Sequence, residues 1–86
     1  MMKKNKRKLT LDRPATYRIK VPGELDQRWS DWYGGMTITV GRDDNGLPVS
    51  TLTSTVDQAA LQGLLRRFYS LGLPLISVIC VEIKDV

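Results

Sequence analysis

The order of hydrophobic patterns along the chain predicts an α+β fold with a ferredoxin-like β-α-β-β-α-β arrangement, in which two helices cover one face of a four-stranded antiparallel sheet. Three observations predict it: four segments suited to strands, two segments with apolar residues at helical spacing, and turn residues between them. The chain has 86 residues, which suits one small domain. We expect a flexible basic tail over residues 1–15 and a single α+β domain over residues 16–86.

The first strand and the first helix follow the tail directly. Residues 16–21 alternate apolar and polar side chains, the pattern of a half-buried strand, with Tyr17, Ile19 and Val21 facing the core. Pro22-Gly23 ends this strand. Apolar residues then stand at positions 25, 29, 32 and 33, which is the stripe of a short amphipathic helix closed by Gly34-Gly35.

A hairpin is predicted next. Met36, Ile38 and Val40 alternate with threonines and predict a second strand. The Arg-Asp-Asp-Asn-Gly sequence at 42–46 is a turn signal, because Asn and Gly tolerate a positive φ. A third strand is expected around residues 49–54, but Val49 and Leu52 have opposite parity, so the pattern leaves its buried face open.

The second helix is the clearest element of the sequence. Thr55 followed by Gln58 fits a capping box, and Asp57 stands in the expected first turn. Gly72 is expected just after the helix, and Pro74 prevents its continuation. The apolar stripe consists of Leu61, Leu64, Leu65, Phe68 and Leu71.

The last strand, over residues 75–83, is apolar on both faces, which is typical of a strand covered on both sides. We nevertheless expect it at an edge of the sheet, where an uncovered apolar strand favours aggregation. A second copy of the chain is the simplest cover, which predicts a homodimer through the open sheet face or this edge. The alternative is that the tail or another local segment covers the strand.

The basic charge of the protein is concentrated at its N-terminus. The formal net charge is +4, but residues 1–15 carry six basic and one acidic side chains, and residues 16–86 carry seven basic and eight acidic ones. Lysine and arginine side chains bind the phosphate backbone of nucleic acids. The candidate nucleic-acid contacts are Lys3, Lys4, Lys6, Arg7 and Lys8.

Other parts of the sequence limit the nucleic-acid hypothesis and the chemistry. Arg18 and Lys20 share the polar face of the first strand, but no aromatic residue is predicted on that face to stack a base. The chain has no histidine and one cysteine, which excludes a Ser-His-Asp triad and a cysteine-rich zinc site within one chain. We expect no enzymatic activity, no cofactor and no bound metal. Cys80 is expected to be a small buried or half-buried hydrophobic residue.

No segment has the length and continuity of a transmembrane helix, and the basic start is not followed by the apolar stretch of a signal peptide. The lone cysteine fits a reducing compartment. We therefore expect a cytoplasmic protein that does not bind membranes.

Two blocks of the chain resemble a group of short uncharacterised bacterial proteins. The blocks are Trp29-x-x-Trp32-Tyr33 followed by Met36-Thr-Ile-Thr39, and Asp57-Gln-Ala-Ala-Leu61-x-Gly63-Leu-Leu65 followed by Leu71-Gly-Leu-Pro-Leu75-Ile-Ser-Val78. The resemblance covers residues 17–81 and implies no activity. Gln62 stands where similar chains often have histidine, so a role that needs an imidazole there does not transfer to this protein.

The sequence predicts a non-enzymatic binding or interaction module that self-associates. Arg28, Trp29 and Trp32 are candidates for a ligand or peptide groove beside the first helix, although packing on the sheet also explains the aromatic residues. Ile76, Val78 and Cys80 are candidates for partner contact in the last strand. The alternative function is a weak, sequence-independent nucleic-acid binder that uses the basic tail.

Overall fold

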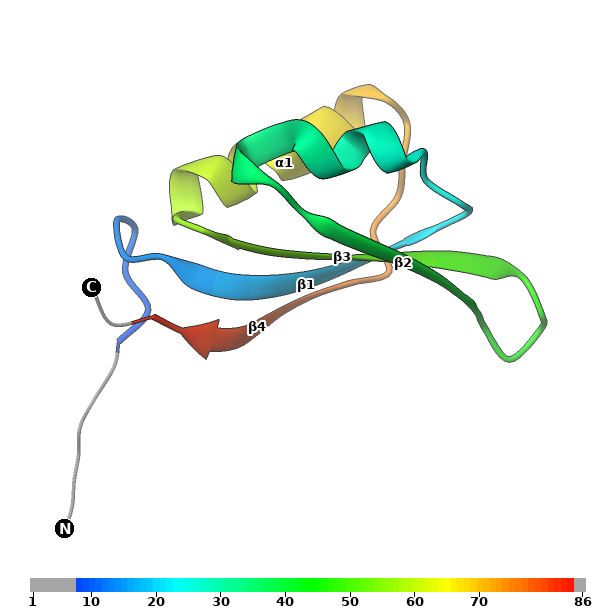
Figure 1. Cartoon of the computed structure of the whole chain (residues 1–86), viewed down its shortest axis with the longest axis horizontal. Helices are drawn as coiled ribbons and strands as arrows, with labels where there is room; N and C mark the ends of the chain where they lie inside the picture. Colours follow the sequence, from blue (N-terminus) through cyan, green and yellow to red (C-terminus); the bar gives the residue numbers. More distant parts are fainter. Residues whose placement is uncertain (1–7, 85–86) are drawn as a thin grey trace, which may run out of the picture.

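Four antiparallel strands form one sheet in the order β2-β3-β1-β4 (Figure 1). The computed structural model describes residues 8–84, without the side chains of residues 32–34. Two helical segments lie on the same side of the sheet (Figure 1). In chain order the elements are β1 (Ala15–Pro22), the 3-10 helix η1 (Gln27–Gly34), β2 (Thr37–Arg42), β3 (Pro48–Val56), α1 (Gln58–Ser70) and β4 (Ser77–Ile83).

The predicted ferredoxin-like β-α-β-β-α-β arrangement is wrong, although the fold is α+β. Among residues 8–84 there is a single α-helix, between β3 and β4, and the segment between β1 and β2 is a 3-10 helix. This segment spans eight residues, which is too short for a stable isolated α-helix. Asp26 fixes its tight first turn, because its carbonyl accepts a hydrogen bond from Trp29 N at 3.1 Å and its carboxylate accepts one from Arg28 N at 2.9 Å.

The core lies between the sheet and the two helical segments. Alternate residues of β1 are buried, which confirms the predicted core face of the first strand. In β3 the buried residues are Ser50, Leu52 and Ser54, so two serines occupy core positions and explain why the apolar pattern does not reveal the buried face. The buried apolar cluster consists of Ala15, Tyr17, Ile19, Val21, Met36, Ile38, Leu52, Leu61, Leu64 and Phe68.

The hairpin of β2 and β3 extends beyond the helical layer at its turn (Figure 1). The turn itself is as predicted: Asp43 accepts hydrogen bonds on its carboxylate from Asn45 N and Leu47 N, and Gly46 has a φ of +81°. The second strand is confirmed, but Val40 is 42% exposed. No helix covers this end of the hairpin.

The helix α1 begins two residues later than the predicted capping box. Its N-cap is Asp57, whose carboxylate accepts a hydrogen bond from Ala60 N at 2.9 Å. Thr55 instead remains in β3, where its hydroxyl is 2.7 Å from the hydroxyl of Thr16. The predicted end is confirmed, because Leu71 is the C-cap and Gly72 follows with a φ of +77°.

Candidate functional site

The edge strand β4 presents apolar side chains on both faces of the sheet. Its register with β1 places Val78 beside Ile19 and Cys80 beside Tyr17, on the side of the helices. Ile79 lies beside Arg18, on the opposite side. The helical layer does not cover this strand, so Val78 is 38% and Ile79 is 50% exposed.

A β-bulge interrupts β4 near its end. The register changes from Tyr17 opposite Cys80 to Thr16 opposite Glu82, so Val81 is an extra residue without a partner in β1. The bulge returns Ile83 to the side of the helices, where it is half-buried and packs against the core. Before the bulge, β4 contributes no residue to the buried cluster among the described residues.

The outer edge of β4 also presents backbone groups to solvent. In β1, alternate residues bond to the two neighbouring strands. The hydrogen bond from Gly23 N to Pro48 O shows that the backbone N–H and C=O groups of odd-numbered β1 residues point toward β3. The hydrogen bond from Ile76 N to Lys20 O shows that those of even-numbered residues point toward β4. Across the ladder, Ser77 and Ile79 therefore bond to β1, and the N–H and C=O groups of Val78 and Cys80 point to the outer edge. No strand within the described part of the chain pairs with that edge.

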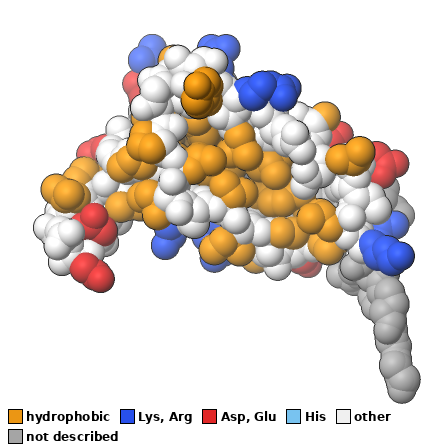
Figure 2. All heavy atoms as spheres, turned by 180° about the vertical axis from the view of Figure 1, so that it is seen from behind, with side chains coloured by type: hydrophobic (Ala, Val, Ile, Leu, Met, Phe, Trp, Pro, Cys, Tyr) orange, Lys and Arg blue, Asp and Glu red, His pale blue; other side chains and the backbone are white. Residues whose placement is uncertain are grey.

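An open groove runs along α1, and no β4 residue lines it. Tyr17 connects α1 and β4, since its hydroxyl accepts a hydrogen bond from Gln58 Nε2 at 2.7 Å and its partner in β4 is Cys80. Seen from behind, hydrophobic side chains gather across the middle of the molecule (Figure 2). The groove is lined by Gln58, Leu61, Gln62, Leu65, Arg66 and Tyr69.

We refer to Ile76, Val78, Ile79, Cys80 and Val81 as the β4 strip. The side chains of Ile76, Val78, Ile79 and Val81 are 38–53% exposed, and no charged residue lies between positions 76 and 81. Burying the exposed surface of any one of these four side chains against a partner would stabilise the complex by about 1 kcal/mol. This combination of apolar side chains and outward backbone groups is what an edge strand offers to another strand.

The family of the chain follows from a comparison with family models. The model of a domain of unknown function, DUF8691, matches residues 16–79. The chain belongs to this family. No curated protein and no solved structure shows significant similarity to the chain. The match runs from the second residue of β1 to the third residue of β4, so it covers η1, β2, β3 and α1 in full and β1 and β4 in part.

The residues predicted beside the first helix do not join the β4 strip. η1 lies against β2, and β2 and β4 are at opposite edges of the sheet. Trp29 is half-buried with its ring centroid 4.9 Å from that of Phe68, so it packs the helical layer together. The side chain of Trp32 lies outside the described part of the structure.

Arg28 forms an exposed ion pair with Asp26, the residue before η1. Its guanidinium is 3.0 Å from the carboxylate of Asp26. Hydrogen bonds from the backbone N–H and then the guanidinium of Arg28 lower the pKa of Asp26. Because both groups are exposed, this pair contributes little to stability.

The structure brings together the predicted residues of the last strand. Val78 and Cys80 share one side of β4, and Ile76 precedes them at the start of the strand, where its N–H bonds to Lys20. Cys80 is exposed, so its predicted burial is wrong: the helical layer ends before it reaches β4. The groove residues Leu65 and Tyr69 are not among the predicted site residues, although their i, i+4 spacing places them on one helix face.

Of the predicted nucleic-acid contacts, only Lys8 lies within the described residues, and it is exposed. Lys3, Lys4, Lys6 and Arg7 lie outside them. Residues 8–14 are exposed or half-buried, and Leu11 O accepts a hydrogen bond from Gln58 N at 3.2 Å. This contact anchors the segment before β1 to the start of α1.

Within residues 8–84, no three His, Cys, Asp or Glu side chains lie close enough together to hold a metal ion. Neither helical segment that the structure describes is long and apolar enough to cross a membrane.

Proposed function

We propose that this protein is a small non-enzymatic interaction module that self-associates through the outer edge of β4. The observation that carries the proposal is the β4 strip, which combines uncharged apolar side chains with backbone N–H and C=O groups at an unpaired edge. Pairing with another strand would satisfy those backbone groups and bury apolar side chains on both faces of the sheet.

A second copy of the chain is the partner that fits this edge. In a two-fold symmetric dimer the same patch meets itself, so the patch must be self-complementary. An uncharged apolar strand meets this condition. The open sheet face does not, because a two-fold contact there would bring the Arg18 and Lys20 side chains of two copies together.

Antiparallel pairing of two β4 strands extends the sheet from one copy into the other. The outward groups of Val78 and Cys80 then bond to those of the second copy, and Ile79 lies next to the two-fold axis. In this arrangement the two Cys80 side chains lie on the same side of the joined sheet, in diagonal positions with Cβ atoms about 7–8 Å apart.

The single cysteine of the chain makes this arrangement directly testable. A short bismaleimide reagent should convert the purified protein at micromolar concentration into a covalent dimer through Cys80. Val78→Lys combined with Ile79→Lys should reduce the cross-linked fraction at least fivefold, because it places like charges across the interface. Gel electrophoresis under denaturing conditions measures the fraction.

The opposite edge strand supplies the matched control. Val40 in β2 is 42% exposed, so Val40→Lys adds charge to the other edge and should leave cross-linking unchanged. Sedimentation velocity on uncross-linked protein measures the mass independently. A monomer at high micromolar concentration contradicts the proposal, as does a cross-linked fraction that the β4 double variant leaves unchanged.

The N-terminal segment is the competing cover for β4. A shallow depression at the end of the strand is lined by Leu9, Cys80, Val81, Glu82 and Ile83, so Leu9 already lies beside it. Deleting residues 2–7 should leave the cross-linked fraction unchanged if a second copy is the partner. A dimer that appears only after this deletion would show that the segment covers the edge and would overturn the proposal for the full chain.

A further inference from the structure

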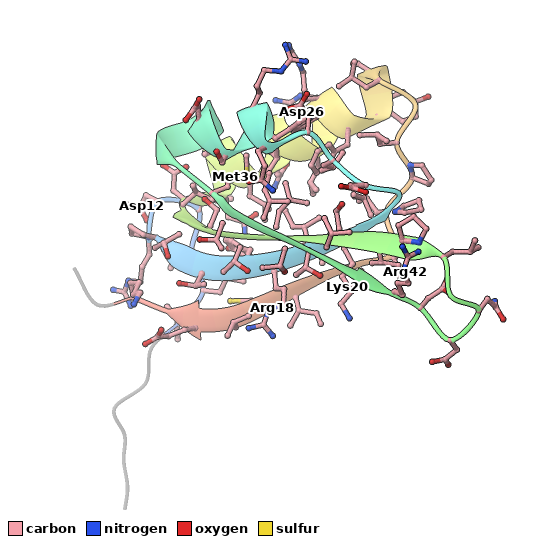
Figure 3. The ribbon with its side chains drawn as sticks, turned by 45° about the vertical axis from the view of Figure 1, so that its right-hand side comes forward. Asp12, Arg18, Lys20, Asp26, Met36 and Arg42 are labelled. Carbon is pink, nitrogen blue, oxygen red and sulfur yellow. The ribbon has the colours of Figure 1, made fainter. Side chains whose placement is uncertain are left out.

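The sheet face opposite the helices carries two rows of hydroxyl and basic side chains. The register aligns Thr37, Thr53 and Arg18 across the sheet in one row. Thr39, Thr51 and Lys20 form the next row. Arg18 and Lys20 project from the sheet on the side away from the helices (Figure 3). We refer to these six residues as the basic face.

The two cations of the basic face have no acidic partner in the described structure. Arg18 and Lys20 are exposed and form no ion pair there. The nearest carboxylate in the register is that of Glu82, opposite Thr16, and it is 3.3 Å from the ammonium of Lys84. The face therefore carries two positive charges in the middle of the sheet, about 6.6 Å apart along β1.

The sequence extends this positive charge along the N-terminal segment. Residues 1–20 carry eight basic and one acidic side chains, and residues 21–86 carry five basic and eight acidic ones. Arg18 and Lys20 lie in β1, which is a central strand of the sheet. In the sequence, the basic N-terminal segment comes directly before β1 and therefore precedes the strand that carries Arg18 and Lys20.

We propose that the basic face binds the phosphodiester backbone of a nucleic acid. Arginine and lysine neutralise phosphates, and threonine hydroxyls donate hydrogen bonds to phosphate oxygens. Tyr17 points into the core, and no aromatic residue among those described lies on this face, so bases are not stacked. The binding is therefore independent of sequence and sensitive to salt.

An anionic membrane does not fit this face equally well. Proteins that bind membrane surfaces insert apolar side chains next to their basic residues. None of the six residues of the basic face is apolar; the apolar residues of the same side, Pro22, Val49 and Ile79, flank it. A nucleic-acid backbone needs only charge and hydrogen-bond donors.

Fluorescence anisotropy with labelled single-stranded RNA and duplex DNA of 20 nucleotides or base pairs tests the proposal. Arg18→Gln combined with Lys20→Gln should weaken binding at least fivefold at 50 mM salt. It should also lower the slope of log K against log salt by about 1.4 for single strands and 1.8 for duplexes. If the protein binds both the RNA and the DNA, it recognises the phosphate backbone that they share. If it binds only one of them, that nucleic acid is the ligand class.

The control removes the same charge from the helical side. Arg28→Gln combined with Arg66→Gln changes two exposed arginines away from the basic face, and affinity should change less than twofold. The variant without residues 2–7 should bind more weakly but retain its dependence on Arg18 and Lys20. Equal losses in the two double variants, no binding at 100 µM, or binding only to anionic vesicles would each overturn the proposal. The proposal does not rest on self-association.

Discussion

Ser50 shows how one buried polar side chain fixes the path of the backbone. It is fully buried in β3, and its hydroxyl donates a hydrogen bond to Gly23 O at 2.7 Å and accepts one from Leu25 N at 2.8 Å. Both partners lie in the connection from β1 to η1. The serine therefore satisfies two backbone groups of a segment that has no regular structure.

Ser50→Ala should lower the free energy of unfolding by about 1–3 kcal/mol, because it leaves Gly23 O and Leu25 N without their partner. Urea unfolding followed by tryptophan fluorescence measures this change. Ser70→Ala, at the exposed end of α1, is the control and should change stability by less than about 0.5 kcal/mol. Equal effects of the two substitutions would contradict the role assigned to Ser50.

The same residue marks a limit of sequence analysis. Alternation of apolar residues predicts the buried face of β1, where every core position is apolar. It does not do so in β3, where serines occupy two of the three buried positions. A serine can be buried when its hydroxyl has partners, and those partners become visible only when residues 25–27 positions apart meet in the fold.

At the scale of elements, the helical segments differ in how well their patterns define them. α1 is thirteen residues long and has a cap at each end, so its apolar stripe predicts it correctly. η1 has a similar apolar stripe but is held by short-range bonds around Asp26. Periodicity alone does not separate an eight-residue 3-10 helix from a short α-helix.

Comparing two substitutions tests which residue caps α1. Asp57→Ala should destabilise the protein by about 1 kcal/mol, because the carboxylate that accepts from Ala60 N is lost. Thr55→Ala removes only an exposed hydroxyl bond to Thr16 and should cost less than about 0.5 kcal/mol. Thermal unfolding followed by circular dichroism compares them. A larger loss for Thr55→Ala would restore the predicted capping box.

At the scale of the whole molecule, one sheet carries three different surfaces. They are the apolar core face under the helices, the basic face on the other side, and the apolar outer edge of β4. The apolar character of β4 is visible in the sequence, and so is the excess of basic residues before position 21. The bulge, the exposure of Cys80 and the alignment of the threonine rows are not, because they depend on how β1 pairs with its neighbours. Pairing two copies at β4 would join their basic faces into one longer surface.

Self-association should make thermal stability depend on protein concentration. Because one folded copy binds a second folded copy and unfolded chains do not, mass action raises the unfolding temperature as concentration rises. For a domain of this size we expect an increase of about 3 °C or more for each tenfold increase in concentration above the dissociation constant. Differential scanning calorimetry or fluorimetry between 5 and ~500 µM measures it. The variant with Val78→Lys and Ile79→Lys should unfold at one temperature throughout, and Val40→Lys should behave as the unmodified chain does. A concentration-independent unfolding temperature in the unmodified protein would mean that the β4 edge does not contribute to its stability through a second copy.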